Sequence, residues 1–313
     1  MNIQEFKNFS DRIRASVSKV ILGKDEVIGQ LTIALITGGH VLLEDLPGTG
    51  KTMLLRAFAA SIGLDFRRIQ FTPDLLPSDL TGIYFYNQKN SEFEFRPGPL
   101  FSGVVLADEI NRATPRSQSA LLEVMEEHQI SIDGITHKLP EPYLVMATQN
   151  PIESYGTFPL PEAQMDRFLM RLSMGYMSRE EEIRVLTRED ARDIVAKITP
   201  VTDREEILRL QKEYREVKLS EEIAAYIMDL AEYTRSSSLL LAGVSARGTI
   251  ALARTSQARA ALSGRDYVIP EDVKAEIPYV FPHRLSLVKR SHSDTDQFIR
   301  NMLETTAVPL EAL

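Results

Sequence analysis

A run of residues at 45–52, Asp-Leu-Pro-Gly-Thr-Gly-Lys-Thr, has the composition of a loop that binds phosphate groups. It follows an apolar segment, 40–44, that predicts a buried strand, and it precedes a helical pattern over 51–62. Its glycines let consecutive backbone N–H groups point at an anion, and the start of the following helix adds partial positive charge. Lys51 would reach the β and γ oxygens of a triphosphate, and Thr52 would hold Mg²⁺ through its hydroxyl. This order of elements therefore predicts a nucleoside triphosphate site.

The loop departs from the usual pattern at its first position. The pattern Gly-x-x-x-x-Gly-Lys-Ser/Thr asks for glycine where this chain has Asp45. A carboxylate so close to phosphate oxygens is unfavourable unless its side chain points away from them. The residues that we expect to contact the nucleotide through this loop are Leu46, Pro47, Gly48, Thr49, Gly50, Lys51, Thr52 and Met53.

Two carboxylates follow a second apolar segment. Residues 104–107, Val-Val-Leu-Ala, predict a buried strand, and Asp108 and Glu109 come directly after it. Open α/β sheets bind their ligands at the carboxyl ends of the strands. We expect Asp108 to orient Mg²⁺ together with Thr52, and Glu109 to polarise an attacking water. Alone, the pair would be an ordinary solvated strand end, so this interpretation depends on the phosphate loop.

The identity of the nucleotide is inferred from motifs that the sequence lacks, and the type of reaction from the two carboxylates. The sequence has no Asn-Lys-x-Asp run, which reads guanine, and no Leu-Ser-Gly-Gly-Gln run, the signature of transporter ATPases. ATP is therefore the better candidate. A carboxylate placed for water directly after the metal-binding Asp favours hydrolysis over phosphoryl transfer to another substrate.

Helical and strand patterns indicate how these motifs are positioned. Apolar residues spaced three or four apart predict amphipathic helices, short apolar runs predict buried strands, and turn residues between strand-like segments predict hairpins. The second hairpin contains Asp133-Gly134, a pair suited to a type I′ turn. The expected elements are helices over 6–20, 25–37, 51–62 and 117–128, strands over 40–44, 104–107 and 143–147, and hairpins over 83–95 and 130–139.

The pattern changes at about residue 176, after which strands nearly vanish and helical stripes take over. We therefore expect an α/β nucleotide-binding core over 1–176, with the two hairpins as insertions. A helical domain is expected over 177–313.

Composition argues against several other classes of protein. Lys and Arg total 36 against 44 Asp and Glu, so the net charge is −8 and no general basic field attracts nucleic acid. The absence of Cys excludes disulfides, thiolate zinc sites and thiol nucleophiles, and the five His lack metal-ligand spacing. No signal-peptide core is present near residue 1, and the longest apolar stretch, 28–43, is broken by polar residues and glycines. We expect a cytoplasmic protein without membrane insertion and without nucleic acid as its partner.

Six segments of the sequence together resemble one family. They are similar to the motifs of the MoxR-type AAA+ ATPases, and the match covers essentially the whole chain. The resemblance implies an AAA+ P-loop αβα core with a parallel sheet and a C-terminal all-helical lid domain, and in that family Asp at position 45 is a familiar variant of the loop. The segments are Glu-Asp-Leu-Pro-Gly-Thr-Gly-Lys-Thr (44–52), Phe-Thr-Pro-Asp-Leu-Leu-Pro-Ser-Asp-Leu-Thr-Gly (71–82), Gly-Pro-Leu-Phe (98–101), Asp-Glu-Ile-Asn-Arg-Ala (108–113), Ala-Thr-Gln-Asn-Pro (147–151) and Leu-Pro-Glu-Ala-Gln-Met-Asp-Arg-Phe (160–168).

The resemblance also implies roles for individual residues. Asn150 looks like the first sensor, aimed at the γ-phosphate and the lytic water, although Asn-Pro on its own favours a turn. Arg167 resembles the arginine finger that reaches the nucleotide of a neighbouring subunit, whereas an isolated Arg more often forms a surface ion pair. Arg247 looks like the second sensor, directed at the γ-phosphate from the first turn of a helix that Ser245 would cap. Family members usually carry Pro where Ala246 stands, which is a mild departure.

A strip at residues 20–23 resembles the family's contact with adenine. Leu22 and Gly23 are its candidate contact residues. The same strip is equally well explained as the end of a helix, because Gly is common there.

The resemblance implies an assembly and partners as well. Activity would need a homo-oligomeric ring, expected to be a hexamer, with ATP and Mg²⁺ bound and with protein clients that often contain von Willebrand factor A domains. The two hairpins would face the centre of the ring, although their aromatic residues could equally pack an edge sheet. Two alternatives stay open, namely a chelatase- or helicase-type motor of the same clade and an ATP-gated regulator that does not hydrolyse ATP.

Overall fold

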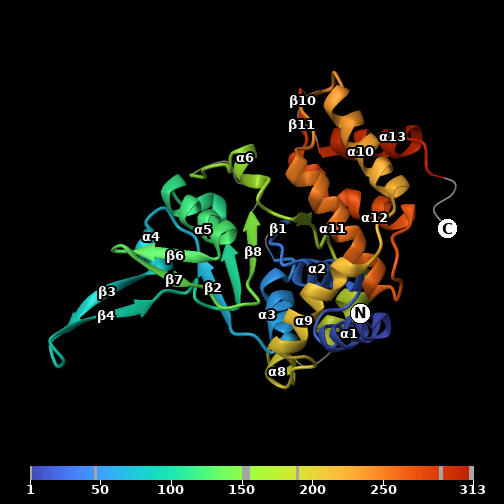
Figure 1. Cartoon of the computed structure of the whole chain (residues 1–313). Coiled ribbons are helices and arrows are strands. Elements are labelled where there is room, and N and C mark those ends of the chain that lie inside the picture. The colour runs from blue at the N-terminus through green and yellow to red at the C-terminus, as the bar shows by residue number, and fades with distance from the viewer. Residues whose placement is uncertain (1, 46–47, 150–155, 188–189, 289–291, 310–313) are drawn as a thin grey trace.

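A five-stranded parallel sheet lies in the amino-terminal part of the computed structural model, which describes residues 2–45, 48–149, 156–187, 190–288 and 292–309 (Figure 1). The strand order is β2-β5-β8-β1-β9. Because every pair in this sheet is parallel, the carboxyl ends of the strands share one edge, which we call the carboxyl edge. The strands are β1 (Val41–Glu44), β2 (Phe66–Gln70), β5 (Val104–Asp108), β8 (Leu144–Gln149) and β9 (Met170–Leu172).

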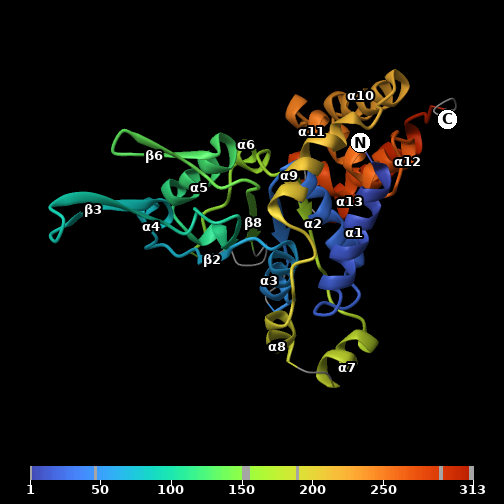
Figure 2. The same cartoon turned by 60° about the horizontal axis from the view of Figure 1, so that its bottom comes forward.

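Side chains of the central strands alternate between two hydrophobic cores. On β1, Val41 and Leu43 join one core and Leu42 joins the other, as the two-residue period of a strand requires. Because helices cover both faces of the sheet, the central strands consist of consecutive apolar residues (Figures 1 and 2). Helices α1 (Ile3–Val17), α2 (Asp25–Thr37) and α3 (Lys51–Ile62) contribute to the first core, and α5 (Pro115–Glu127) contributes to the second.

The ends of these helices follow local signals. The side chain of Asn2 caps α1 by accepting a hydrogen bond from the backbone N–H of Gln4. Gly38 ends α2 in the left-handed conformation, with φ of 68°. The structure confirms the predicted bounds of 25–37 and 51–62, whereas α1 ends at Val17 because 18–20 form a turn.

Both predicted hairpins are present. The turn of the second contains Asp133 and Gly134 with φ of 50° and 81°, as a type I′ turn requires. The ring of Phe95 in the first hairpin stacks on His137 of the second with 4.2 Å between ring centroids. The first hairpin projects from the body of the molecule (Figures 1 and 2). The hairpins are β3 (Gly82–Asn87) with β4 (Glu92–Pro97), and β6 (Gln129–Ile132) with β7 (Ile135–Lys138), and short helical elements nearby are α4 (Pro77–Thr81) and η1 (Ile110–Arg112).

The chain after β9 is mainly helical. Most of its buried apolar residues belong to the same core as those of α1–α3, and this part contacts α1, α2 and the edge strand β9. Two short antiparallel strands, β10 and β11, accompany the helices and were not predicted from the sequence. The short helix α6 (Glu162–Met165) precedes β9. The elements after β9 are α7 (Arg179–Thr187), α8 (Ala191–Ala196), α9 (Arg204–Glu213), η2 (Tyr214–Glu216), α10 (Glu221–Ser236), β10 (Leu240–Ala242), α11 (Ala246–Leu262), α12 (Pro270–Val280), η3 (Pro282–Arg284), β11 (Ser286–Leu287) and α13 (His292–Thr305).

The structure confirms the predicted class, an α/β core with a parallel sheet followed by a helical part. Within the described ranges, no helix combines the length and the apolar character that a bilayer crossing demands.

Candidate functional site

The glycines of the phosphate loop adopt the conformation that an anion cradle needs. Gly48 and Gly50 have φ of 84° and 87°, and a Cβ at either position would meet no other atom within 4 Å. The backbone there is open to a ligand, and α3 begins directly afterwards at Lys51. The Nζ atom of Lys51 donates a hydrogen bond to the carbonyl oxygen of Asp45, 3.0 Å away. The described part of the predicted loop therefore fits a phosphate group, while Leu46 and Pro47 lie outside the described residues.

The side chain of Asp45 is directed away from the phosphate loop. Its carboxylate accepts hydrogen bonds from Ser173 Oγ at 2.7 Å and from the backbone N–H groups of Met174 at 2.7 Å and Gly175 at 3.1 Å. The residue is 6% exposed. The Asp45 side chain therefore points away from the phosphate oxygens, as an acid at this position must. Its carboxylate binds the segment that follows β9.

We predict that Asp45→Ala lowers the free energy of unfolding by about 2 to 4 kcal/mol, since the buried N–H of Met174 and the partly buried N–H of Gly175 lose a charged acceptor. Ser173→Ala is the matched control. It removes one hydroxyl donor, leaves both N–H groups paired, and should cost about 1 kcal/mol. Urea unfolding of the two variants measures the difference. Equal losses would show that the carboxylate does not hold the 173–175 segment.

Asp108 lies at the end of β5 and is held from two neighbouring strands. Its Oδ1 accepts from Thr148 Oγ1 at 2.6 Å, on β8. Its Oδ2 accepts from the guanidinium of Arg68 on β2, with Nη2 at 2.6 Å and Nε at 2.9 Å. The orientation of the Asp108 carboxylate is thus fixed at the carboxyl edge of the sheet, where the sequence predicts the metal site.

Glu109 has an unusual backbone that turns it out of the strand. Its φ and ψ of 57° and 50° are left-handed, and its N–H donates to Thr148 Oγ1 at 2.8 Å. One carboxylate oxygen, Oε2, accepts from Gln70 Nε2 at 2.7 Å and pairs with Arg112 Nε at 3.1 Å. Glu109 is therefore positioned by β2, β8 and η1 together, at the same edge as Asp108.

The residues at this edge fit Mg²⁺ in its usual setting. Mg²⁺ keeps several waters and takes only one or two carboxylates together with substrate phosphates. In the part of the chain that the structure describes, no three His, Asp or Glu side chains converge on a point, so no all-protein metal cage is present there. Asp108 at the end of β5 and Thr52 in the first turn of α3 are the oxygen donors that would hold Mg²⁺ beside a triphosphate.

The opposite, amino edge of the sheet is marked by His40, which precedes β1. The Nδ1 atom of His40 accepts from the N–H of Val145 at 3.1 Å, and Nε2 lies 3.0 Å from the carbonyl oxygen of Met125 in the last turn of α5. The N–H of Leu169 donates to the carbonyl of His40 at 2.8 Å. Burial lowers the pKa of His40 to about 4, so the imidazole is neutral near pH 7 and Nε2 donates to Met125. The end of α5 and the residues before β9 therefore meet at the amino edge.

Arg167 and Arg247 share one carboxylate at this amino edge. Arg167 Nη2 lies 3.1 Å from Glu126 Oε2, and Arg247 donates to Oε1 of the same residue. Strand β1 separates this cluster from the phosphate loop of the same chain, and its four residues span about 13 Å. The resemblance implies that Arg247 is directed at a γ-phosphate, and in the structure its ion pair with Glu126 on α5 lies beside that of Arg167. The role of Arg247 at a γ-phosphate stays a prediction.

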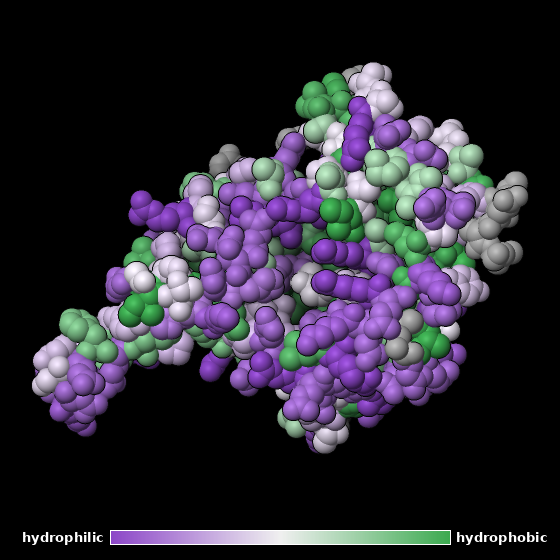
Figure 3. All heavy atoms as spheres, in the orientation of Figure 1, coloured by the Kyte–Doolittle hydropathy of each residue, from purple (hydrophilic) through white to green (hydrophobic). Residues whose placement is uncertain are grey.

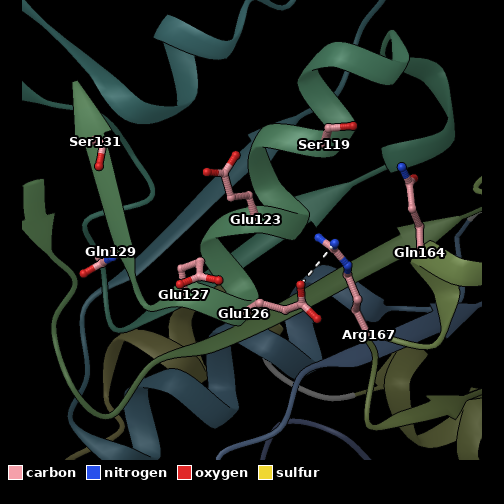
Figure 4. Close-up of a pocket in the computed structure, with 8 residues that line it drawn as sticks. All are labelled: Ser119, Glu123, Glu126, Glu127, Gln129, Ser131, Gln164 and Arg167. Carbon is pink, nitrogen blue, oxygen red and sulfur yellow. Dashed lines mark ion pairs between the residues drawn. The ribbon is translucent and has the colours of Figure 1, made fainter. Parts of the chain in front are cut away.

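A groove of about 440 Å³ borders Arg167 (Figure 4). The side chain of Arg167 is 29% exposed and points toward Glu126 on α5, which also lines the groove. A molecule that approaches this face can therefore reach the guanidinium. The lining residues are Ser119, Glu123, Glu126, Glu127, Gln129, Ser131, Gln164 and Arg167.

The structure gives less information on the remaining predicted site residues, Asn150, Leu22 and Gly23. Asn150 lies outside the described residues. Leu22 and Gly23 follow α1, and a Cβ at Gly23 would overlap the carboxylate of Glu181 on α7. The strip thus contacts the segment that follows β9. The role of the strip in binding adenine stays a prediction.

Sequence reasoning missed the residues that hold the two carboxylates. Arg68 and Gln70 lie on β2, which was not predicted, and Thr148 was not singled out. The only sequence signal for Thr148 is its place at the end of an apolar run, next to the segment 147–151.

Comparison with known proteins identifies similar sequences along the chain. The model of the "ATPase family associated with various cellular activities (AAA)" matches residues 40–170, and the model of the "AAA lid domain" matches residues 232–302. The uncharacterised protein YeaC of Bacillus subtilis is 48% identical over 94% of this chain and 93% of its own length. Chaperone MoxR1 of Mycobacterium tuberculosis is 40% identical over 96% of this chain and 82% of its own length.

A solved structure has the same fold. A crystal structure of a protein from Cytophaga hutchinsonii has a TM-score of 0.91 and 39% sequence identity, and the match covers 98% of this chain and 97% of that one. The similarity therefore extends over the sheet and the helical part together.

Proposed function

The chain belongs to the MoxR-type AAA+ ATPases, and we propose that it couples ATP hydrolysis to the remodelling, assembly or activation of partner proteins. As a member of this family it is an ATPase. One observation carries the proposal about mechanism: the carboxylates Asp108 and Glu109 lie at one edge of the sheet, while the exposed Arg167 lies at the other. A single protomer thus holds two halves of a site that cannot meet within it.

We assign each step of hydrolysis to residues of this chain. The loop 48–52 and the amino end of α3 bind the phosphates, and Lys51 moves from the Asp45 carbonyl to the β and γ oxygens. Asp108 and Thr52 would hold Mg²⁺, which would neutralise phosphate charge. Glu109, fixed by Gln70 and by the Thr148 hydroxyl, polarises the attacking water.

The missing half of the site comes from a neighbouring protomer. Arg167 is accessible on the amino edge, and Arg247 lies within reach of the same carboxylate. We place both guanidiniums at the nucleotide of the next protomer, where they stabilise charge in the transition state. Repetition of this head-to-tail contact closes a homo-oligomeric ring, which we propose to be a hexamer.

The projecting hairpin β3–β4 is the proposed contact with clients. Phe93 and Phe85 on it are 71% and 41% exposed, and hydrophobic surface lies next to hydrophilic surface on this hairpin in Figure 3. MoxR1 carries the name of a chaperone. These two observations support protein clients, among which we propose proteins with von Willebrand factor A domains. We further propose that a core over 1–176 and a lid over 177–313 move relative to one another during the cycle.

ATP turnover per protomer, measured against protein concentration, tests the proposal. We expect the rate per protomer to rise as rings assemble, and Lys51→Ala to abolish it at every concentration. If the wild-type protein binds ATP but never hydrolyses it, the chain is an ATP-gated regulator instead. Proteins retained by Glu109→Gln with ATP, but not with ADP, would identify the clients.

A further inference from the structure

The segment that carries Arg167 is held by one buried arginine of the helical part. Arg284, in η3, donates from Nε to Asp166 Oδ1 at 2.7 Å. Its Nη2 donates to the carbonyl of Phe168 at 2.6 Å, and its Nη1 donates to the carbonyl of Leu169 at 3.1 Å. The Arg284 side chain is 2% exposed. One guanidinium thus binds the residues on both sides of Arg167.

Two serines of the helical part add contacts to the same segment. Ser245 donates to Asp166 Oδ2 at 2.9 Å, so both oxygens of that carboxylate are bound from the helical part. The same hydroxyl caps α11 by accepting from the N–H of Gly248 at 3.2 Å. Ser286 donates to Glu162 Oε1 at 2.6 Å. The residues from 162 to 169 are therefore docked on the helical part of their own protomer.

A glycine makes room for this arginine. A Cβ at Gly248 would lie 2.6 Å from Arg284 Cδ and 2.6 Å from Val244 Cγ1, closer than real Cβ atoms approach other atoms. Gly248 lies near the start of α11, where φ is not positive and glycine lowers helix stability relative to alanine. The local preference of the helix therefore does not explain this glycine, whereas the path of Arg284 does.

We propose that Arg284 is a positioning residue for Arg167, so that the helical part of each protomer sets how that protomer presents Arg167 to its neighbour. The inference rests on the proposed function of Arg167 in trans. Asp45, at the start of the phosphate loop, binds the segment 173–175 between β9 and the helical part.

The geometry explains why arginine is needed at position 284. A guanidinium is a planar fork whose donors reach several acceptors at once, whereas an ammonium is a single point of charge. Lysine cannot bind Asp166 and the carbonyls of Phe168 and Leu169 together. A displacement of about 1 Å in a catalytic group can lower a rate about 100-fold, so a small shift of the Arg167 backbone suffices.

Two variants test the role of Arg284 without touching a group that contacts ATP. Arg284→Lys and Gly248→Ala should each lower kcat about 10-fold to 100-fold while the KM for ATP stays near its wild-type value. Gly29→Ala is the matched control, because a Cβ at Gly29 in α2 meets no atom within 4 Å. It should leave kcat unchanged. Normal kcat in a folded Gly248→Ala ring would overturn the proposal.

Mixed rings show where the defect acts. Protomers with Gly248→Ala keep an intact phosphate loop and Glu109, and Glu109→Gln protomers keep an intact Arg167. Mixing the two should raise turnover well above the mean of the separate variants, because each Gly248→Ala site beside a Glu109→Gln protomer regains a correctly placed arginine. No rise would place the defect within the protomer and overturn the proposal.

Arg167→Ala mixed with Glu109→Gln is the reference for this experiment. Recovery in the reference mixture, together with failure in the Gly248→Ala mixture, would reject only the role of Arg284. Failure in the reference mixture would reject the trans role of Arg167 and, with it, the proposed function on which this inference rests.

Discussion

Arg167→Ala is expected to lower ATP turnover by about 10³-fold or more, since an arginine donated to the transition state contributes on that scale. The affinity for ATP should change little. Arg167 lies at the amino edge of the sheet, with β1 between it and the phosphate loop of its own chain, so its removal leaves the binding cradle intact. Single-turnover rates and equilibrium binding of a fluorescent ATP analogue measure the two quantities separately.

Glu126→Gln is the control for the ion pair that Arg167 makes within its own protomer. It keeps Arg167 and removes the negative charge between Arg167 and Arg247. Because this pair is partly exposed, its loss should change stability by less than about 1 kcal/mol and should leave turnover near the wild-type rate. If Arg167→Ala instead lost ATP binding while remaining folded, the assignment to a neighbouring site would be wrong.

The phosphate loop was predictable because its chemistry is local. Glycines that adopt positive φ, a lysine and a threonine at the start of a helix are adjacent in sequence, and the structure places the described ones as predicted. Asp108 and Glu109 were found by the same kind of local signal, because they come directly after four apolar residues of β5, and their roles in catalysis stay predictions. The outward turn of Asp45 could be stated only as a condition, because its partners at 173–175 are more than 120 residues away in the sequence.

Strand β2 could not be predicted because it is an edge strand. Its sequence, Phe-Arg-Arg-Ile-Gln, contains three polar residues out of five, and most of its side chains are exposed. Exposed edge positions do not show the apolar run of a buried strand. Arg68 and Gln70, which hold Asp108 and Glu109, were missed for this reason.

The place of Arg247 could not be predicted from local pattern either. The pattern predicts its helix and the cap by Ser245, and the structure confirms both. The place of the Arg247 side chain depends on its contact with Glu126 on α5, which lies 121 residues away in the sequence. Glu126, which joins Arg247 to Arg167, is one of several acidic residues on an exposed helix face and carries no distinguishing signal.

Glu109→Gln is expected to lower kcat by about 10²-fold to 10⁴-fold, because the amide cannot accept a proton from the attacking water. The two side chains have the same shape, and the Glu109 N–H keeps its bond to Thr148, so the left-handed backbone should be retained. ATP affinity and ring assembly with ATP should therefore match those of the wild-type protein. Rapid-quench hydrolysis and light scattering with ATP measure these properties.

Glu205→Gln, at an exposed position in the first turn of α9, is the control for loss of one negative charge and should leave kcat unaltered. An unchanged rate in Glu109→Gln would remove Glu109 from the reaction.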